Sequence, residues 1–179
     1  VITGTNGKST ACKLTQHIFK NNRIDAQLGG NIGKPVLDLK IKRKSIIIIE
    51  ASSFQLAYAK FIKPNLAVVL NISSDHLDWH KTITNYKNSK FKIFSKQDGK
   101  DVALLNDKKL IKLFHKNRYS SRLKIVQKNS LKNVVKNKIN NNYLTSVPNL
   151  ENLMFAHEIS KIFKIKKKNF INAVNNFKG

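Results

Sequence analysis

The 179-residue sequence has a single cysteine, Cys12, and only ten acidic residues. One cysteine excludes an intramolecular disulfide framework and a cysteine-rich zinc site, which fits a reducing compartment. No apolar run approaches the roughly 18 to 20 residues that a membrane-spanning helix needs. The first eleven residues also lack the basic region, apolar core and cleavage site of a signal peptide. We therefore expect a cytoplasmic protein without a membrane partner.

Positive charge is in large excess, since 34 lysines and arginines against ten acids give a formal net charge of +24. Only four of the basic residues are arginine, and the lysines are spread along the whole chain among many asparagines and isoleucines. Nucleic-acid recognition favours arginine and clustered basic tracts with aromatic residues between them. The pattern favours a coding bias displayed on a solvated surface over a specific nucleic-acid partner. Weak, salt-dependent attraction to polyanions is still expected.

Short apolar runs alternate with stretches of helical periodicity, and the length suits one domain of ordinary size. The run Ile46 to Ile49 is apolar on both faces, which is typical of a parallel sheet covered by helices. The pattern predicts an α/β fold with a mostly parallel sheet flanked by helices. Strands are expected at residues 1–3, 45–50, 66–71, 102–106 and 124–127, and helices at 8–21, 53–60, 85–94 and 107–116.

Three segments have further features beyond this alternating pattern. Residues 149–163 and 167–177 have apolar positions three or four apart, which predicts a terminal helix pair. The Asn- and Lys-rich segment Leu131 to Asn142 is interpreted as irregular structure or an edge strand. Val1 to Gly4 is typical of a buried strand that runs into a glycine turn. Because a native protein rarely starts in mid-strand, we expect a fragment of a longer protein.

The first motif with chemical meaning is Gly4-Thr5-Asn6-Gly7-Lys8-Ser9-Thr10, between a predicted strand and a predicted helix. Glycines there let backbone N–H groups face phosphate oxygens, and the helix start adds partial positive charge. Lys8 would reach the terminal phosphates and the Ser9 hydroxyl would bind Mg²⁺. Ile2 stands where the general phosphate-loop pattern has glycine. The strand before and the helix after favour phosphate binding over a plain glycine-rich turn.

Two further motifs follow predicted strands, at the sheet edge where α/β proteins bind ligands. Glu50 ends the isoleucine run, and its carboxylate would hold hydrated Mg²⁺. A strand-end carboxylate that caps the next helix together with Ser52 or Ser53 is the competing interpretation. The stretch Asn71 to His80 contains two acids and two histidines within six residues, which is consistent with a hard-metal and phosphate site.

The remaining candidates are weaker when taken singly. Lys90 follows Tyr86 by one helical turn, but lysine is so common here that composition alone favours a surface role. Gly29 to Gly33 is interpreted as a glycine turn that could bring Asn31 to a ligand. Asn149 and Asn152 lie at the start of a predicted helix.

Taken together, four stretches resemble the Mur ligases, and within them the branch that adds D-glutamate. They are Gly4 to Thr10, Gly29 to Gly33, Glu50 to Gln55 and Asn71 to Asp78, in family order and spacing. Sister ligases share the first stretch, whereas the second and third are similar to the D-glutamate branch. The resemblance covers residues 1–179 as a central ATP-binding domain of P-loop NTPase-like fold. It implies that a uridine-nucleotide domain and a carboxy-terminal ligase domain lie outside this range.

The resemblance also implies roles in ATP and metal binding. The loop would wrap the ATP phosphates, with Lys8 on the β- and γ-phosphates and with Ser9 and Glu50 on a first Mg²⁺. His76 would hold a second Mg²⁺. Lys90 matches the family position whose amine carries a CO₂-derived carbamate, a further metal ligand.

On the substrate side, the resemblance implies contacts from Asn31, Ser52 and Tyr86, whereas Asn149 and Asn152 would approach the adenine. Pro148 stands where the family tends to have histidine, a departure on the adenine side.

The implied reaction is ATP-driven amide formation in peptidoglycan precursor synthesis. The small-molecule partners would be ATP, UDP-N-acetylmuramoyl-L-alanine and D-glutamate, joined through an acyl phosphate. The alternatives are a sister Mur ligase, folylpolyglutamate synthase, an isolated nucleotide-binding module and, on charge alone, a nucleic-acid-binding protein. Two of three expected domains lie outside the chain, so we expect the fragment alone to be inactive as a ligase.

Overall fold

The structure is a computed structural model, and it describes residues 1–127, 129, 131 and 138–179. The chain divides into two compact units. The first unit consists of Val1–Asn6 and Ala51–Ile125, and the second consists of Gly7–Glu50 and Val126–Gly179. The boundary between Asn6 and Gly7 falls inside the predicted phosphate loop.

The first unit contains four parallel strands in the order β1-β4-β5-β6. Their bounds are Ile2–Thr3 for β1, Leu66–Val69 for β4, Val102–Leu105 for β5 and Arg122–Ile125 for β6. Ile2 is in register with Val68, and Leu66 is in register with Val102. The central strands β4 and β5 are almost wholly buried, which explains their continuous apolar sequence.

Helices supply the rest of the first unit. They are α2 (Ser53–Tyr58), α3 (Leu77–His80), α4 (Ile83–Phe91) with a 3₁₀ turn η2 (Lys92–Phe94), and α5 (Lys108–Lys116). The core forms where β4 and β5 meet aromatic side chains of these helices, and Phe91, Phe94 and Phe114 are buried there. Asp107 caps α5 by accepting hydrogen bonds from two backbone N–H groups of its first turn, which fixes where that helix begins.

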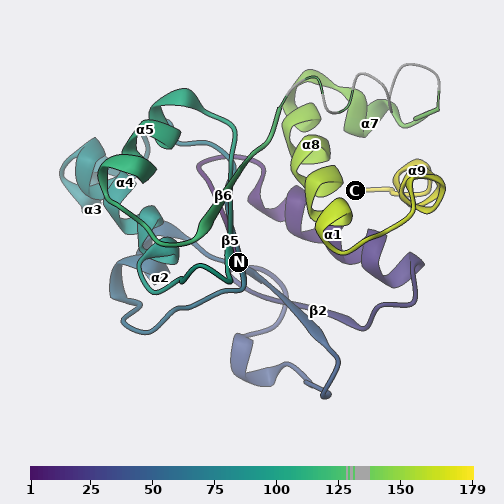
Figure 1. The fold of residues 1–179 in the computed structure, drawn as a ribbon, viewed down its shortest axis with the longest axis horizontal. Coiled ribbons are helices and arrows are strands. Elements are labelled where there is room, and N and C mark those ends of the chain that lie inside the picture. The colour runs from purple at the N-terminus through teal and green to yellow at the C-terminus, as the bar shows by residue number, and fades with distance from the viewer. Residues whose placement is uncertain (128, 130, 132–137) are drawn as a thin grey trace. The chain divides into compact units, whose positions relative to one another are not determined.

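The second unit pairs two parallel strands, β2 (Ala26–Gly30) and β3 (Ile46–Glu50), in register from Ala26 opposite Ile46 to Gly30 opposite Glu50. Its described helices are α1 (Lys8–Asn21), α7 (Asn142–Thr145), α8 (Val147–Ile162) and α9 (Lys167–Asn175), with a 3₁₀ turn η1 at Val36–Asp38. Helix α1 packs on β2 and β3 and also contacts α8 and α9 (Figure 1). Its buried face includes Leu14, Ile18 and Phe19, at the spacing that one face of a helix requires.

The predicted α/β class with parallel strands is confirmed, and so are the predicted helices α1, α2, α4, α5, α8 and α9 within a few residues at each end. The interpretation of Gly29 and Gly30 as a turn was wrong, because both lie in β2. Short helix α3 was not predicted. Half of the segment Leu131 to Asn142, predicted as irregular or edge strand, lies outside the described residues, and its last residue begins α7.

Candidate functional site

The second-unit part of the loop begins at Gly7, which is the N-cap of α1 and has a positive φ of 80°. Glycine has no side chain with which to cap this end of the helix. The first N–H groups of a helix have no partner within the helix, so they can donate to an anion. A Cβ atom at Gly7 would lie 2.3 Å from Oδ1 of Asn152. The left-handed backbone conformation therefore favours glycine at this position, and a larger residue would also displace the Asn152 side chain.

The carboxylate of Glu50 is held at the carboxyl end of β3 and is only 1% exposed. The Ser9 hydroxyl donates to its Oε2 at 2.9 Å, and the Asn31 amide donates to its Oε1 at 2.9 Å. Glu50 does not cap the next helix, because Ser52 is the N-cap of α2 and forms a capping box with Gln55. The competing interpretation is thus confirmed for Ser52 as the cap of the next helix, whereas its assignment of Glu50 to that cap was wrong.

Ser9 and Glu50 form a donor set that suits Mg²⁺. A hydroxyl and a carboxylate already in contact are hard oxygen ligands, and Mg²⁺ is usually held by one or two such groups plus waters and phosphate oxygens. A metal ion here would replace one hydrogen bond and leave the bond from Asn31 to orient the carboxylate. The residues present therefore fit the predicted ion.

The two residues expected on the adenine side, Asn149 and Asn152, lie in the first turns of α8. Asn152 donates to the Oδ1 of Asn149 at 3.2 Å, and Asn149 donates to the backbone carbonyl of Tyr143 at 3.1 Å. The Tyr143 hydroxyl lies 3.4 Å from the Thr10 hydroxyl, at the end of the loop. Sequence reasoning missed Tyr143, since nothing in its Asn-rich surroundings distinguishes it.

The first-unit part of the loop is fixed to the segment after β4. Asn71 accepts hydrogen bonds from the Thr5 N–H through its carbonyl and from the Asn6 N–H through its side chain, both at 2.9 Å. The Thr5 hydroxyl lies 3.1 Å from the Tyr86 hydroxyl and accepts from the Ser73 N–H at 3.0 Å. These contacts fix the backbone of the loop before the glycine at which α1 is capped.

Lys90 is buried, with 1% of its surface exposed. Its Nζ donates to the Gly4 carbonyl at 2.7 Å and to the Thr3 hydroxyl at 3.4 Å, and it lies 4.7 Å from the centroid of the Tyr86 ring. The surface interpretation that composition favoured was wrong. A buried lysine is held here against the first residue of the phosphate loop.

The acids and histidines after β4 do not converge on one point. His76 is half exposed, has a left-handed φ of 51°, and its Nε2 lies 3.5 Å from an oxygen of Asp75. His80 is buried instead, with its Nε2 2.9 Å from the Ser53 hydroxyl. Within the part of the chain that the structure describes, no three acidic, histidine or cysteine side chains gather as a metal site.

Burial lowers the pKa of His80, and the nearby charges of His76 and Lys90 lower it further. A neutral His80 can bridge Ser53 and Ser89, since its Nδ1 lies 3.4 Å from the Ser89 hydroxyl. We conclude that His80 is a packing residue that links α2, α3 and α4, whereas His76 keeps its ring at the surface.

Over residues 1–127, 129, 131 and 138–179, none of the helices combines the length and apolar character required to span a membrane.

These features define an α/β protein of the phosphate-loop class, and comparison with known proteins narrows the class. The Mur ligase middle domain matches residues 2–174, and the chain belongs to the Mur ligase family. The UDP-N-acetylmuramoylalanine–D-glutamate ligase of Rickettsia felis is 34% identical over 98% of this chain and 43% of its own length. The corresponding ligase of Oenococcus oeni is 33% identical over 99% of this chain and 44% of its own length. The chain thus spans less than half of these relatives.

Solved structures agree on the fold. The UDP-N-acetylmuramate:L-alanyl-gamma-D-glutamyl-meso-diaminopimelate ligase of Neisseria meningitides is similar with a TM-score of 0.72 at 14% identity, over 99% of this chain and 65% of that one. The MurF ligase of Thermotoga maritima, solved in complex with ADP, has a TM-score of 0.70 at 14% identity, over 99% and 48%. The predicted Mur ligase central-domain fold is confirmed.

Proposed function

We propose that residues 1–179 are the central, nucleotide-binding part of a ligase that uses ATP to add D-glutamate to UDP-N-acetylmuramoyl-L-alanine. The observation that carries the proposal is the contact between Ser9 and the buried Glu50 carboxylate, beside the glycine cap of α1. The printed names of the relatives from Rickettsia felis and Oenococcus oeni support the choice of substrates. We accordingly propose that the ligase acts in the cytoplasm, in the synthesis of peptidoglycan precursors.

In this proposal the second-unit part of the loop binds the phosphates of ATP. The N–H groups at the start of α1 donate to phosphate oxygens, and Lys8 screens the charge of the β- and γ-phosphates. Ser9 and Glu50 hold Mg²⁺, which when bound supplies charge neutralisation to the transferring phosphoryl group. Asn31 keeps the Glu50 carboxylate oriented.

The proposed reaction has two steps. A carboxylate oxygen of UDP-N-acetylmuramoyl-L-alanine attacks the γ-phosphorus, the bond to the bridging oxygen breaks, and ADP leaves with that electron pair. The amine of D-glutamate then attacks the acyl carbon, phosphate leaves, and the new amide nitrogen loses a proton. Positioning and charge stabilisation, not covalent chemistry by the protein, lower the barrier.

We further propose that His76 and a carbamate on Lys90 hold a second Mg²⁺. A carbamate forms from a neutral amine, and burial favours the neutral form of a lysine. Lys90 is buried, and a carbamylated nitrogen keeps one hydrogen with which it can still donate to the Gly4 carbonyl. Ser52 and Tyr86 remain our candidates for the substrate side, with Asn149 and Asn152 for the adenine.

The Lys90 proposal is tested in the full-length ligase. We expect Lys90→Ala to lose activity by about 10² or more, as for loss of an electrostatic contact to a transferring group. Acetate should restore part of that activity by replacing the missing anion. If Lys90 acts as an ammonium, acetate will not rescue and Lys90→Arg will stay active. Full activity of Lys90→Ala contradicts both roles.

Substrate choice is tested by ADP release from the full-length ligase with UDP-N-acetylmuramoyl-L-alanine and one amino acid at a time. We expect ADP release only in the mixture whose amino acid is D-glutamate. Release with another amino acid points to a sister ligase, and release with a folate substrate and L-glutamate points to folylpolyglutamate synthase. Nucleotide binding without ADP release in any mixture would favour the isolated binding module.

A further inference from the structure

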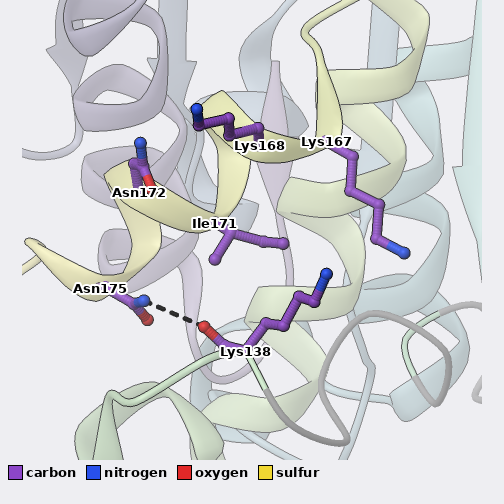
Figure 2. A pocket seen from close by; sticks show the side chains of 6 residues that line it. All are labelled: Lys138, Lys167, Lys168, Ile171, Asn172 and Asn175. Carbon is purple, nitrogen blue, oxygen red and sulfur yellow. Dashed lines mark hydrogen bonds between the residues drawn. The ribbon is translucent and has the colours of Figure 1, made fainter.

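The second unit contains a pocket of about 540 Å³ on one side of α9. It is lined by three lysines, two asparagines and one apolar residue: Lys138, Lys167, Lys168, Ile171, Asn172 and Asn175. In Figure 2 the side chains of Lys138 and Lys167 reach toward the same side of Ile171. Lys168 extends the other way, on the side of Asn172. None of the six lining residues is acidic, so the pocket favours an anion.

The position of Lys167 and Lys168 on α9 adds to the positive potential. They are the first two residues of this nine-residue helix, whose first turn contains no acidic residue and whose N-cap makes no side-chain hydrogen bond. The start of a helix itself carries partial positive charge, so an anion is stabilised there and a lysine is not.

The Lys138 side of the pocket is held in place by Asn175. The Asn175 amide donates to the Lys138 carbonyl at 3.0 Å, and its oxygen accepts from the Asn140 N–H at 2.8 Å. One side chain thus fixes the backbone on both sides of residue 139 against the last turn of α9. The backbone of Lys138 is therefore held beside α9 by the fold.

The pocket is separate from the phosphate loop. Asn169, in the first turn of α9, donates to Asn22 at the end of α1, whereas the loop lies at the start of α1. A helix of 14 residues is about 21 Å long. An anion in this pocket would therefore not share ligands with a nucleotide on Gly7 and Lys8.

We propose that this pocket binds a small oligophosphate anion, between Lys138 and Lys167 with Ile171 at its side. Several negative charges match several ammonium groups, and charge-assisted hydrogen bonds from lysine suit phosphate oxygens. The volume suits a small molecule. None of the six described lining residues is aromatic, so these residues offer no stacking surface of the kind that single-stranded nucleic acid uses. The inference does not rest on the proposed ligase function.

The test is a titration of the isotope-labelled 179-residue chain with pyrophosphate, followed by amide signals in NMR spectra. Signals of residues 167–172 report the new pocket, and signals of Gly7, Lys8 and Ser9 report the phosphate loop separately. We expect saturable shifts in the first group. The double variant Lys138→Gln/Lys167→Gln should weaken that response about tenfold, as expected for two partly exposed charge contacts. The response of the loop should stay unchanged.

The matched control is Lys109→Gln/Lys112→Gln, which removes the same charge from exposed positions on α5. This variant should bind pyrophosphate at α9 as the unchanged chain does. Unshifted α9 signals, or equally weakened pyrophosphate binding in both double variants, would contradict a specific site. Such a result would mean that diffuse positive charge attracts the anion. If the α9 signals saturate at a lower concentration of a single-stranded RNA oligonucleotide than of pyrophosphate, a small oligophosphate is not the ligand of this pocket.

Discussion

Lys90 and His80 both differ from what their residue type and surroundings in the sequence suggested. Lys90 is one of 30 lysines, yet it is buried against the Gly4 carbonyl, and only the family resemblance singled it out. His80 belongs to a motif rich in acids and histidines, yet it bonds to two serines inside the first unit. Residue type and spacing therefore do not decide a role until burial and hydrogen-bond partners are known.

The lowered pKa of His80 predicts a pH dependence of stability. Below about pH 6.5 the unfolded chain binds a proton at this histidine, whereas the folded chain resists it. Stability should therefore fall as the pH drops from 7 toward 5, and His80→Gln should reduce that slope. Urea unfolding at several pH values measures it. The exposed His115 supplies the control, and an equal reduction in His115→Gln would contradict the assignment.

Cys12 provides a second residue-level prediction. It is fully buried on α1, and burial raises the pKa of its thiol to about 12, with the Glu50 charge adding to the effect. A thiol in this state is a poor nucleophile at neutral pH. We expect no labelling by a thiol reagent at pH 7.5 in the folded chain and full labelling in urea. Rapid labelling without urea would contradict the packing of α1.

Strand β2 requires a glycine at its last residue. Gly30 has a φ of +106°, and a Cβ atom there would lie 2.3 Å from the Glu50 carbonyl oxygen. We expect Gly30→Ala to lower the free energy of unfolding by about 1–3 kcal/mol or more. Gly99→Ala should change it by less than about 0.5 kcal/mol, because a Cβ at Gly99 meets no atom within 4 Å. Thermal unfolding of the two variants gives the comparison, and equal stability would contradict the β2 geometry.

The same strand explains what sequence reasoning could and could not find. Long periodic helices such as α1 and α8 were predicted because their apolar spacing is a local signal. Strand β2 was missed because Gly29 and Gly30 suggest a turn, and only the close approach of Lys34 and Glu50 explains glycine in a strand. For the same reason the bond from Asn31 to Glu50 could not be predicted, since pairing of β2 with β3 creates it.

For the whole chain, the net charge of +24 predicts how it behaves with nucleic acids. Diffuse lysines attract a polyanion without selecting a sequence, and salt releases it. We expect weak binding to unrelated DNA and RNA oligonucleotides at low salt that largely disappears at physiological ionic strength. Fluorescence anisotropy at two salt concentrations measures this. Tight, sequence-selective binding that persists would favour a nucleic-acid-binding protein over a ligase.

Phosphate binding by the loop at the start of α1 is the property on which the proposed ligase depends, and calorimetric titration with Mg²⁺-ATP measures it directly. Lys8→Ala is compared with Lys13→Ala, an exposed lysine on the same helix. Loss of a charge-assisted contact costs about 1.5–3 kcal/mol, so Lys8→Ala should weaken binding at least about tenfold. Lys13→Ala should leave the affinity unchanged, and chelation of Mg²⁺ should weaken binding by the unchanged chain. Equal affinities for all three chains, with or without Mg²⁺, would contradict a phosphate-binding loop.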